Sequence, residues 1–136
     1  MLAECEKHDV ALIFLIAPTT NQKRLKQIID SSCGNVYLVS TLSVSGEKNT
    51  IAAITKTMIF RVKSLAKGKI PIAVGFGISQ PKHVKEILRY GADGVIVGSA
   101  IINRINNGAC SDIRQFVLAL KESTKNLSSS KNPFSE

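Results

Sequence analysis

The stretch that decides the fold is residues 71–100, PIAVGFGISQPKHVKEILRYGADGVIVGSA. Two short apolar runs lie within it, at residues 72–74 and 94–97, and each leads through a glycine turn into a helical pattern. Continuous apolar runs without alternation are typical of parallel strands that are buried on both faces. The stretch therefore predicts two strand-turn-helix units in tandem.

Capping residues mark the helix of the first unit, which we expect over about residues 80–90. Ser79 is a suitable N-cap, Pro81 suits the first helical turn, and Gly91 is suited to end the helix. The second unit leads into a short apolar helix over about residues 100–105.

The glycine turns are candidates for binding a phosphate group. Gly77, Gly98 and Ser99 lie where strands end and helices begin, so main-chain N–H groups there lack helical partners. The helix dipole adds positive potential at the same place. In a single unit, the glycines need only permit a tight strand-to-helix turn. Two adjacent units favour the phosphate site, which eight-stranded barrels form after strands seven and eight.

The rest of the chain repeats the same alternation of strands and helices. The further expected elements are strands at 11–17 and 36–40, helices at 22–32 and from about 51 to Gly68, and a last helix from residues 110–112, which Ser111 would cap. These elements predict an α/β fold of four parallel β/α units.

Four segments carry a resemblance to one family. PIAVGFGIS (71–79) and GADGVIVGSAI (91–101) resemble the carboxy-terminal part of the tryptophan synthase α subunit. IFLIAPTT (13–20) and YLVSTLSVSG (37–46) resemble its fifth strand, and its sixth strand with the mobile loop. The resemblance covers about residues 2–120. It implies a (β/α)8 TIM-barrel family fold, of which residues 1–124 form the carboxy-terminal half-barrel. Residues 125–136 are polar in composition, and we expect them to form a disordered tail.

The amino-terminal half of the barrel is not part of these 136 residues. A complete barrel of this kind typically needs about 250 residues. We expect the chain to be a fragment, to obtain its other half from a second polypeptide, or to close by self-association. The apolar edge strands at 11–17 and 94–97 would favour self-association.

The activity that the resemblance implies is a retro-aldol cleavage of indole-3-glycerol phosphate to indole and glyceraldehyde 3-phosphate, a step in tryptophan biosynthesis. The family's catalytic Glu and Asp belong to the missing half, so we assign no catalytic residue here. Asp93 precedes a strand and would lie at the wrong end of the barrel. Glu47 lies in the loop on the correct side, but a solvated carboxylate is a poor proton donor at neutral pH.

Substrate-binding residues can be carried over by motif. The resemblance implies a phosphate site of Gly77, Ile78, Gly98, Ser99 and Gly46, and a pocket for the indole and glycerol parts of Tyr37, Phe76, Ile96 and Ser45. For Tyr37 and Ile96, plain packing inside the barrel is an alternative interpretation.

The loop at residues 41–46 departs from the family pattern. The family usually has Arg or Ser, a variable residue and then Gly-Val-Thr-Gly, whereas this chain reads TLSVSG. Ser45 keeps a hydroxyl group, but Ser43 replaces a glycine and the arginine is absent. Loop closure, and communication with the tryptophan synthase β subunit that the family implies as partner, are therefore in doubt.

Composition excludes several other classes. The net charge is +8, but the basic residues are spread along helices without interleaved aromatic residues, which disfavours nucleic acid. No apolar run is long enough to span a membrane, and we expect a cytoplasmic protein. Cys5, Cys33 and Cys110 have no zinc-site spacing and are expected to be free and buried, and His8 and His83 to be solvated. We expect no metal and no cofactor.

Two alternatives stay open. Other phosphate-binding TIM-barrel enzymes place glycine turns after the same strands, although the loop at 37–46 argues against them. A non-catalytic half-barrel module that holds a phosphorylated ligand would be a stable monomer.

Overall fold

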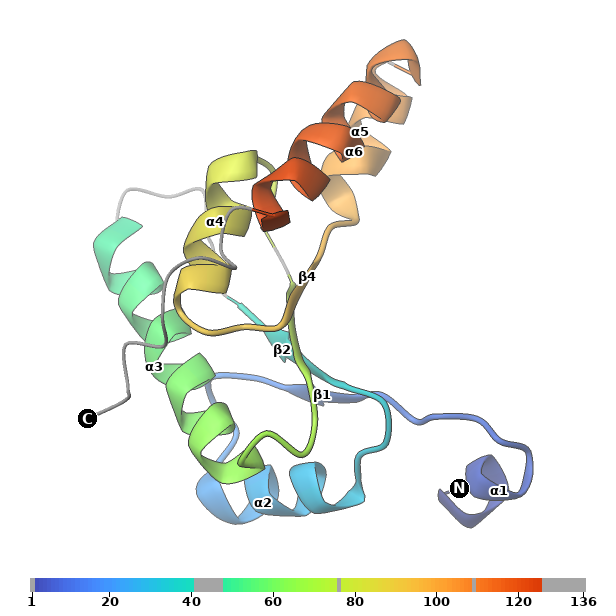
Figure 1. Cartoon of the computed structure of the whole chain (residues 1–136), viewed down its shortest axis with the longest axis vertical. Helices are drawn as coiled ribbons and strands as arrows, with labels where there is room; N and C mark the ends of the chain where they lie inside the picture. Colours follow the sequence, from blue (N-terminus) through green and yellow to red (C-terminus); the bar gives the residue numbers. More distant parts are fainter. Residues whose placement is uncertain (1, 41–47, 76, 109, 126–136) are drawn as a thin grey trace.

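The computed structural model describes residues 2–40, 48–75, 77–108 and 110–125. Short strands alternate with helices along the chain (Figure 1). The elements are α1 (Leu2–Lys7), β1 (Phe14–Ile16), α2 (Gln22–Ser31), β2 (Val36–Val39), α3 (Lys48–Ala66), β3 (Ile72–Gly75), α4 (Pro81–Arg89), β4 (Gly94–Ile96), α5 (Ser99–Asn106) and α6 (Cys110–Lys125).

The four strands form one parallel sheet in the order β1-β2-β3-β4. Each strand therefore pairs with the next one along the chain, and a helix lies between successive strands in the sequence. The register places Tyr37 between Leu15 and Ala73, and Gly75 between Val39 and Ile96. The predicted succession of four parallel β/α units is confirmed.

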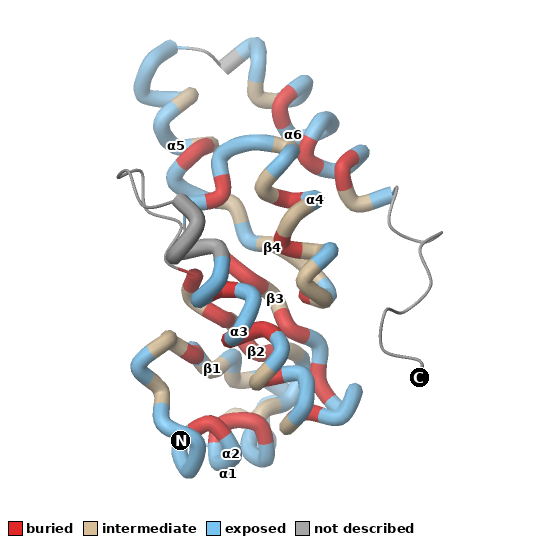
Figure 2. Tube along the Cα trace, turned by 90° about the vertical axis from the view of Figure 1, so that its left-hand side faces the viewer, coloured by how far each residue is buried: buried red, intermediate tan, exposed pale blue. Residues whose placement is uncertain are grey.

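One face of the sheet packs against helices and forms the core. Figure 2 shows buried segments along the strands and on the helix faces that lie near them. The core is formed by alternate residues of the strands and by one side of each covering helix. Fully buried strand residues are Ile16, Val36, Leu38, Ile72 and Val74. Fully buried helix residues, in α2, α3 and α4, are Leu25, Ile59, Val62, Val84 and Ile87. Burial of these side chains supplies the main stabilising term of the fold.

The opposite face of the sheet is incompletely covered by the described part of the chain. On this face Leu15 is 60% exposed and Ile96 is 37% exposed, while Tyr37, Val39 and Ala73 are half-buried. The continuous apolar strands predicted burial on both faces, and this prediction is wrong for the chain alone. The sheet has helices on one side only, so the apolar side chains of the second face lack a second layer.

The strands and caps differ from the prediction in detail. The first strand spans three residues instead of the expected seven. Gln80, and not Ser79, is the N-cap of α4, because Pro81 already occupies the first helical turn. Ser111 does not cap α6, since that helix begins one residue earlier. The helix also runs to Lys125, which had been assigned to the tail; the domain boundary itself stays a prediction, because residues 126–136 lie outside the description.

Polar residues next to the neighbouring strands bind both ends of β3: Asp93, directly before β4, and Ser40, directly after β2. At the amino end, Ile72 N–H donates to Asp93 Oδ2 at 2.9 Å, and Asp93 N–H donates to Ile72 O at 2.9 Å. Lys63 Nζ lies 3.4 Å from the other carboxylate oxygen. At the carboxyl end, Ser40 N–H and Ser40 Oγ both donate to Gly75 O, at 2.8 and 2.9 Å. The position of β3 is therefore fixed at each end.

Helices α3 and α4 lie side by side on the covered face (Figure 1), with Tyr90 at their contact. The Tyr90 hydroxyl donates to Glu86 Oε1, and Lys56 Nζ lies 6.0 Å from the centre of the ring. Burial, and then the hydrogen bond to Glu86 and its negative charge, raise the pKa of Tyr90 from 10.0 to about 12.

This pKa predicts a loss of stability in strong base. Between pH 10 and about 12 the unfolded chain loses the Tyr90 proton while the folded chain retains it, so the free energy of unfolding falls as pH rises. Replacement of Tyr90 by Phe removes this contribution and makes the fall shallower in that window. Urea unfolding at several pH values measures the slopes. From pH 7 to 9 the free energies of unfolding of the two proteins should change with pH in the same way. Equal slopes above pH 10 would contradict the raised pKa of Tyr90.

Candidate phosphate and substrate site

The register of the sheet brings the two predicted glycine turns to one edge. Gly75 pairs with Ile96, and Gly77 and Gly98 each follow two residues later. Both turns thus leave the carboxyl ends of neighbouring strands, where parallel α/β proteins form their sites. Gly77 is exposed and has φ +75°, a left-handed conformation that glycine adopts without steric cost.

The second turn presents the amino end of α5. Gly98 is the N-cap, and its carbonyl accepts from Ile101 N–H at 2.9 Å and Ile102 N–H at 3.1 Å. The N–H groups of Ser99 and Ala100 precede these first helical bonds, and such groups are the ones that a helix leaves without internal partners. Gly98 and Ser99 are exposed, so an anion can approach the positive end of the helix there.

Ile78 can contribute only through its main chain. Its side chain is 3% exposed and belongs to the core, which anchors the residue that follows Gly77. Each turn is therefore followed by a buried residue, Ile78 directly after Gly77 and Ala100 directly after Ser99.

Tyr37 and Ile96 share the incompletely covered face of the sheet. The Tyr37 ring lies over Gly75 on the adjacent strand, so closely that a Cβ atom at Gly75 would be 2.5 Å from ring atoms. Tyr37 is half-buried, and part of its side chain stays accessible. Both predicted interpretations are thus compatible with its position: the ring packs on the neighbouring strand and also lies on the face that leads to the glycine turns.

The remaining predicted site residues lie outside the described residues. These are Gly46 and Ser45 in the loop, together with Glu47, and Phe76 between β3 and the first turn. Their contributions stay predictions.

Asp93 lies at the opposite edge of the sheet from the glycine turns, as the sequence predicted. Its carboxylate accepts from Ile72 N–H and pairs with Lys63, so it stabilises the amino end of β3. The corresponding role of Ser40 at the other end of β3 was not predicted from the sequence. A polar residue directly after an apolar strand was the available signal.

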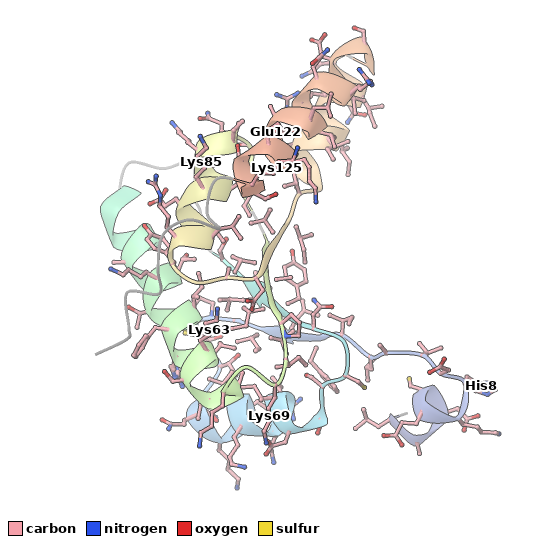
Figure 3. All side chains as sticks on the ribbon, in the orientation of Figure 1. His8, Lys63, Lys69, Lys85, Glu122 and Lys125 are labelled. Carbon is pink, nitrogen blue, oxygen red and sulfur yellow. The ribbon has the colours of Figure 1, made fainter. Side chains whose placement is uncertain are left out.

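The cysteines and histidines were expected to be free of metal, with buried thiols and solvated imidazoles. Among the described residues, no group of three His, Cys, Asp or Glu side chains could hold a metal ion. Cys33 is exposed and Cys5 half-buried, which corrects the expectation of buried thiols, because Cys33 follows α2 in a surface loop. His8 is exposed beside α1, far from the sheet (Figure 3). No helix in the described ranges is long and apolar enough to cross a membrane.

The contact between Tyr37 and position 75 generates a prediction. Replacement of Gly75 by Ala forces the Tyr37 ring to move, because the new methyl group would overlap it, and we expect a loss of about 1–3 kcal/mol in the free energy of unfolding. Gly94 is the matched control in the next strand, since a Cβ atom there meets nothing within 4 Å. Urea unfolding of both variants compares them. Equal stabilities would show that the ring does not restrict Gly75.

Comparisons with known proteins assign the chain to a family. The family model for the tryptophan synthase alpha chain matches residues 1–132. The tryptophan synthase alpha chain of Methanothermobacter thermautotrophicus is 49% identical over 105 residues, which cover 77% of this chain and 38% of the relative. The alpha chain of Arabidopsis thaliana is 40% identical over 126 residues, covering 93% and 44%.

A solved structure agrees with these relatives. The tryptophan synthase A-subunit of Pyrococcus furiosus superimposes with a TM-score of 0.76 at 33% identity, covering 89% of this chain and 49% of that one. The chain thus spans less than half of the length of each of these relatives. The predicted fold, an α/β half-barrel of the TIM-barrel family, is confirmed. The chain belongs to the tryptophan synthase alpha chain family.

Proposed function

We propose that this chain supplies the phosphate-binding half of a tryptophan synthase α-type enzyme. The observation that carries the proposal is the pairing of Gly75 with Ile96, which brings two glycine turns to the carboxyl edge of the sheet. The substrate would be indole-3-glycerol phosphate, cleaved to indole and glyceraldehyde 3-phosphate in tryptophan biosynthesis.

The phosphate group would bind to main-chain N–H groups at the two turns. Gly77 and Ile78 would contribute from the first turn, and Gly98 and Ser99 from the second, with a further contact from Gly46. Tyr37 and Ile96 would face the rest of the substrate, together with Phe76 and Ser45. An anchored phosphate orients the glycerol chain, so binding energy far from the reacting carbon contributes to catalysis.

The cleavage needs two proton transfers that this chain does not provide by itself. One proton goes to the indole carbon that carries the side chain, and another leaves a glycerol hydroxyl as the carbon–carbon bond breaks. Asp93 is unsuited to either transfer, because it lies at the opposite edge and holds the start of β3. We propose that both carboxylates come from the amino-terminal half-barrel and that the isolated chain is inactive.

The uncovered face of the sheet supports this division of roles. Leu15 and Ile96 are exposed on it, and β1 and β4 are the edge strands of the described sheet. Apolar side chains and edge strands of this kind associate with further protein. Four more strands would cover them, from the remainder of a longer chain, from a separate polypeptide or from a second copy.

A tryptophan synthase β subunit is the proposed protein partner, because the Pyrococcus furiosus relative is described as a subunit of tryptophan synthase. The proposal includes no nucleic acid and no cofactor, and it keeps the cytoplasm as the expected location. A non-catalytic phosphate-binding module is the alternative that a negative activity test would favour.

Phosphate binding can be tested on the chain as it is. We expect titration of the isotope-labelled chain with sn-glycerol 3-phosphate to shift the amide signals of Gly77, Ile78, Gly98 and Ser99 selectively. Replacement of Gly77 by Val should abolish the shifts, because a β-branched side chain blocks the anion and disfavours the left-handed backbone.

Gly108 is the matched control for this variant. It also has a left-handed backbone, with φ +73°, and lies in the turn between α5 and α6. Replacement of Gly108 by Val carries the same backbone cost and should leave phosphate binding unchanged. A Gly77 variant that binds as well as the unsubstituted chain would show that the site is misplaced.

A further inference from the structure

Ser40 makes a two-point contact with a single carbonyl group on the adjacent strand. Its N–H and its Oγ donate to Gly75 O at 2.8 and 2.9 Å, across 35 positions of sequence. Ser40 is 1% exposed, so both bonds lie in the protein interior. A carbonyl oxygen has two lone pairs, and Ser40 alone can satisfy both of them.

This contact fixes the orientation of a peptide unit. The carbonyl of Gly75 belongs to a planar peptide group, and two bonds to its oxygen hold that oxygen in place and oppose rotation of the plane. Gly75 itself restricts the rotation little, because glycine has the widest choice of backbone angles. The same peptide group leads, within two residues, to the left-handed Gly77 of the first turn.

We propose that Ser40 is a positioning residue for the phosphate-binding turn. It touches no substrate in this account; it acts by holding the Gly75 carbonyl, and so the N–H groups of Gly77 and Ile78, in the arrangement that an anion needs. The proposal rests on the proposed function of these turns. Asp93 holds the amino end of the same strand, but its bonds lie three residues farther from the turn.

Removal of the Ser40 hydroxyl should increase the mobility of the turn that carries Gly77 and Ile78. Replacement of Ser40 by Ala keeps the N–H bond and leaves one lone pair of a buried carbonyl without its donor. We expect affinity for sn-glycerol 3-phosphate to fall about fivefold, the size of one net hydrogen bond. Replacement by Thr retains the hydroxyl and should restore most of the affinity.

Ser123 provides the matched control. It is also a buried serine, 4% exposed, and its Oγ donates to Ala119 O at 2.8 Å within α6, away from the turns. The Ser40→Ala and Ser123→Ala variants therefore lose the same kind of bond. Urea unfolding measures their stability, and amide hydrogen exchange at Gly77 and Ile78 reports the turn without any ligand.

The proposal predicts a difference that stability alone does not produce. In Ser40→Ala, the amide hydrogens of Gly77 and Ile78 should exchange about fivefold faster than in Ser123→Ala, and glycerol phosphate should bind more weakly. Ser123→Ala should have the same exchange rates and the same affinity as the unsubstituted chain. Equal exchange and equal affinity in the two variants would overturn it. If the unsubstituted chain binds no glycerol phosphate, the proposed function fails. The positioning role is then judged by hydrogen exchange alone: faster exchange at Gly77 and Ile78 in Ser40→Ala supports it, and unchanged exchange refutes it.

Discussion

The parallel register of β2, β3 and β4 is the constraint on which the site depends. Because the strands run in one direction and pair in sequence order, every strand-to-helix turn leaves from the same edge of the sheet. The pairing of Gly75 with Ile96 then brings the two glycine turns together. Asp93 and Ser40 fix this register from opposite ends of β3, with hydrogen bonds of 2.9 Å or less. A slip of β3 by one residue would break both contacts and invert its faces.

The two faces of the sheet differ in burial. One face is buried under α2, α3 and α4 and accounts for most of the apolar core. The other carries Tyr37 and Ile96 and is incompletely covered by the described residues. In the proposed arrangement the interior is shared between two halves, and the apolar side chains that are exposed here would pack against the other half of the barrel. In the proposed function, the chain would contribute main-chain anion binding, and the proton-transfer groups would come from the other half.

Sequence patterns predicted the elements and their order because each signal was local. Apolar runs, helical periodicity and the glycine turns after the third and fourth strands identified the four β/α units. The position of Asp93 just before a strand placed it at the edge away from the proposed site. Long-range contacts were not predictable in this way. The contact of Tyr37 with Gly75 and the bonds from Ser40 join residues 35 or more positions apart, and they follow from the pairing register, which composition does not encode.

The errors have a physical cause as well. The expectation of burial on both faces of each strand is wrong for the described part of this chain, in which helices cover one side of the four strands. Ser79 was expected to be a cap because serine is a good one, but the neighbouring proline determined where α4 begins. Cys33 is exposed because it lies in a surface loop, where residue type is a poor guide to burial.

Release of indole from indole-3-glycerol phosphate should be measured for a mixture of this chain and the amino-terminal half of a full-length relative. The account predicts indole release by the mixture and none by either half alone, since the phosphate site and the carboxylates lie in different halves. Absence of release from a mixture that sizing shows to form a one-to-one complex, or release by this chain alone, would contradict it.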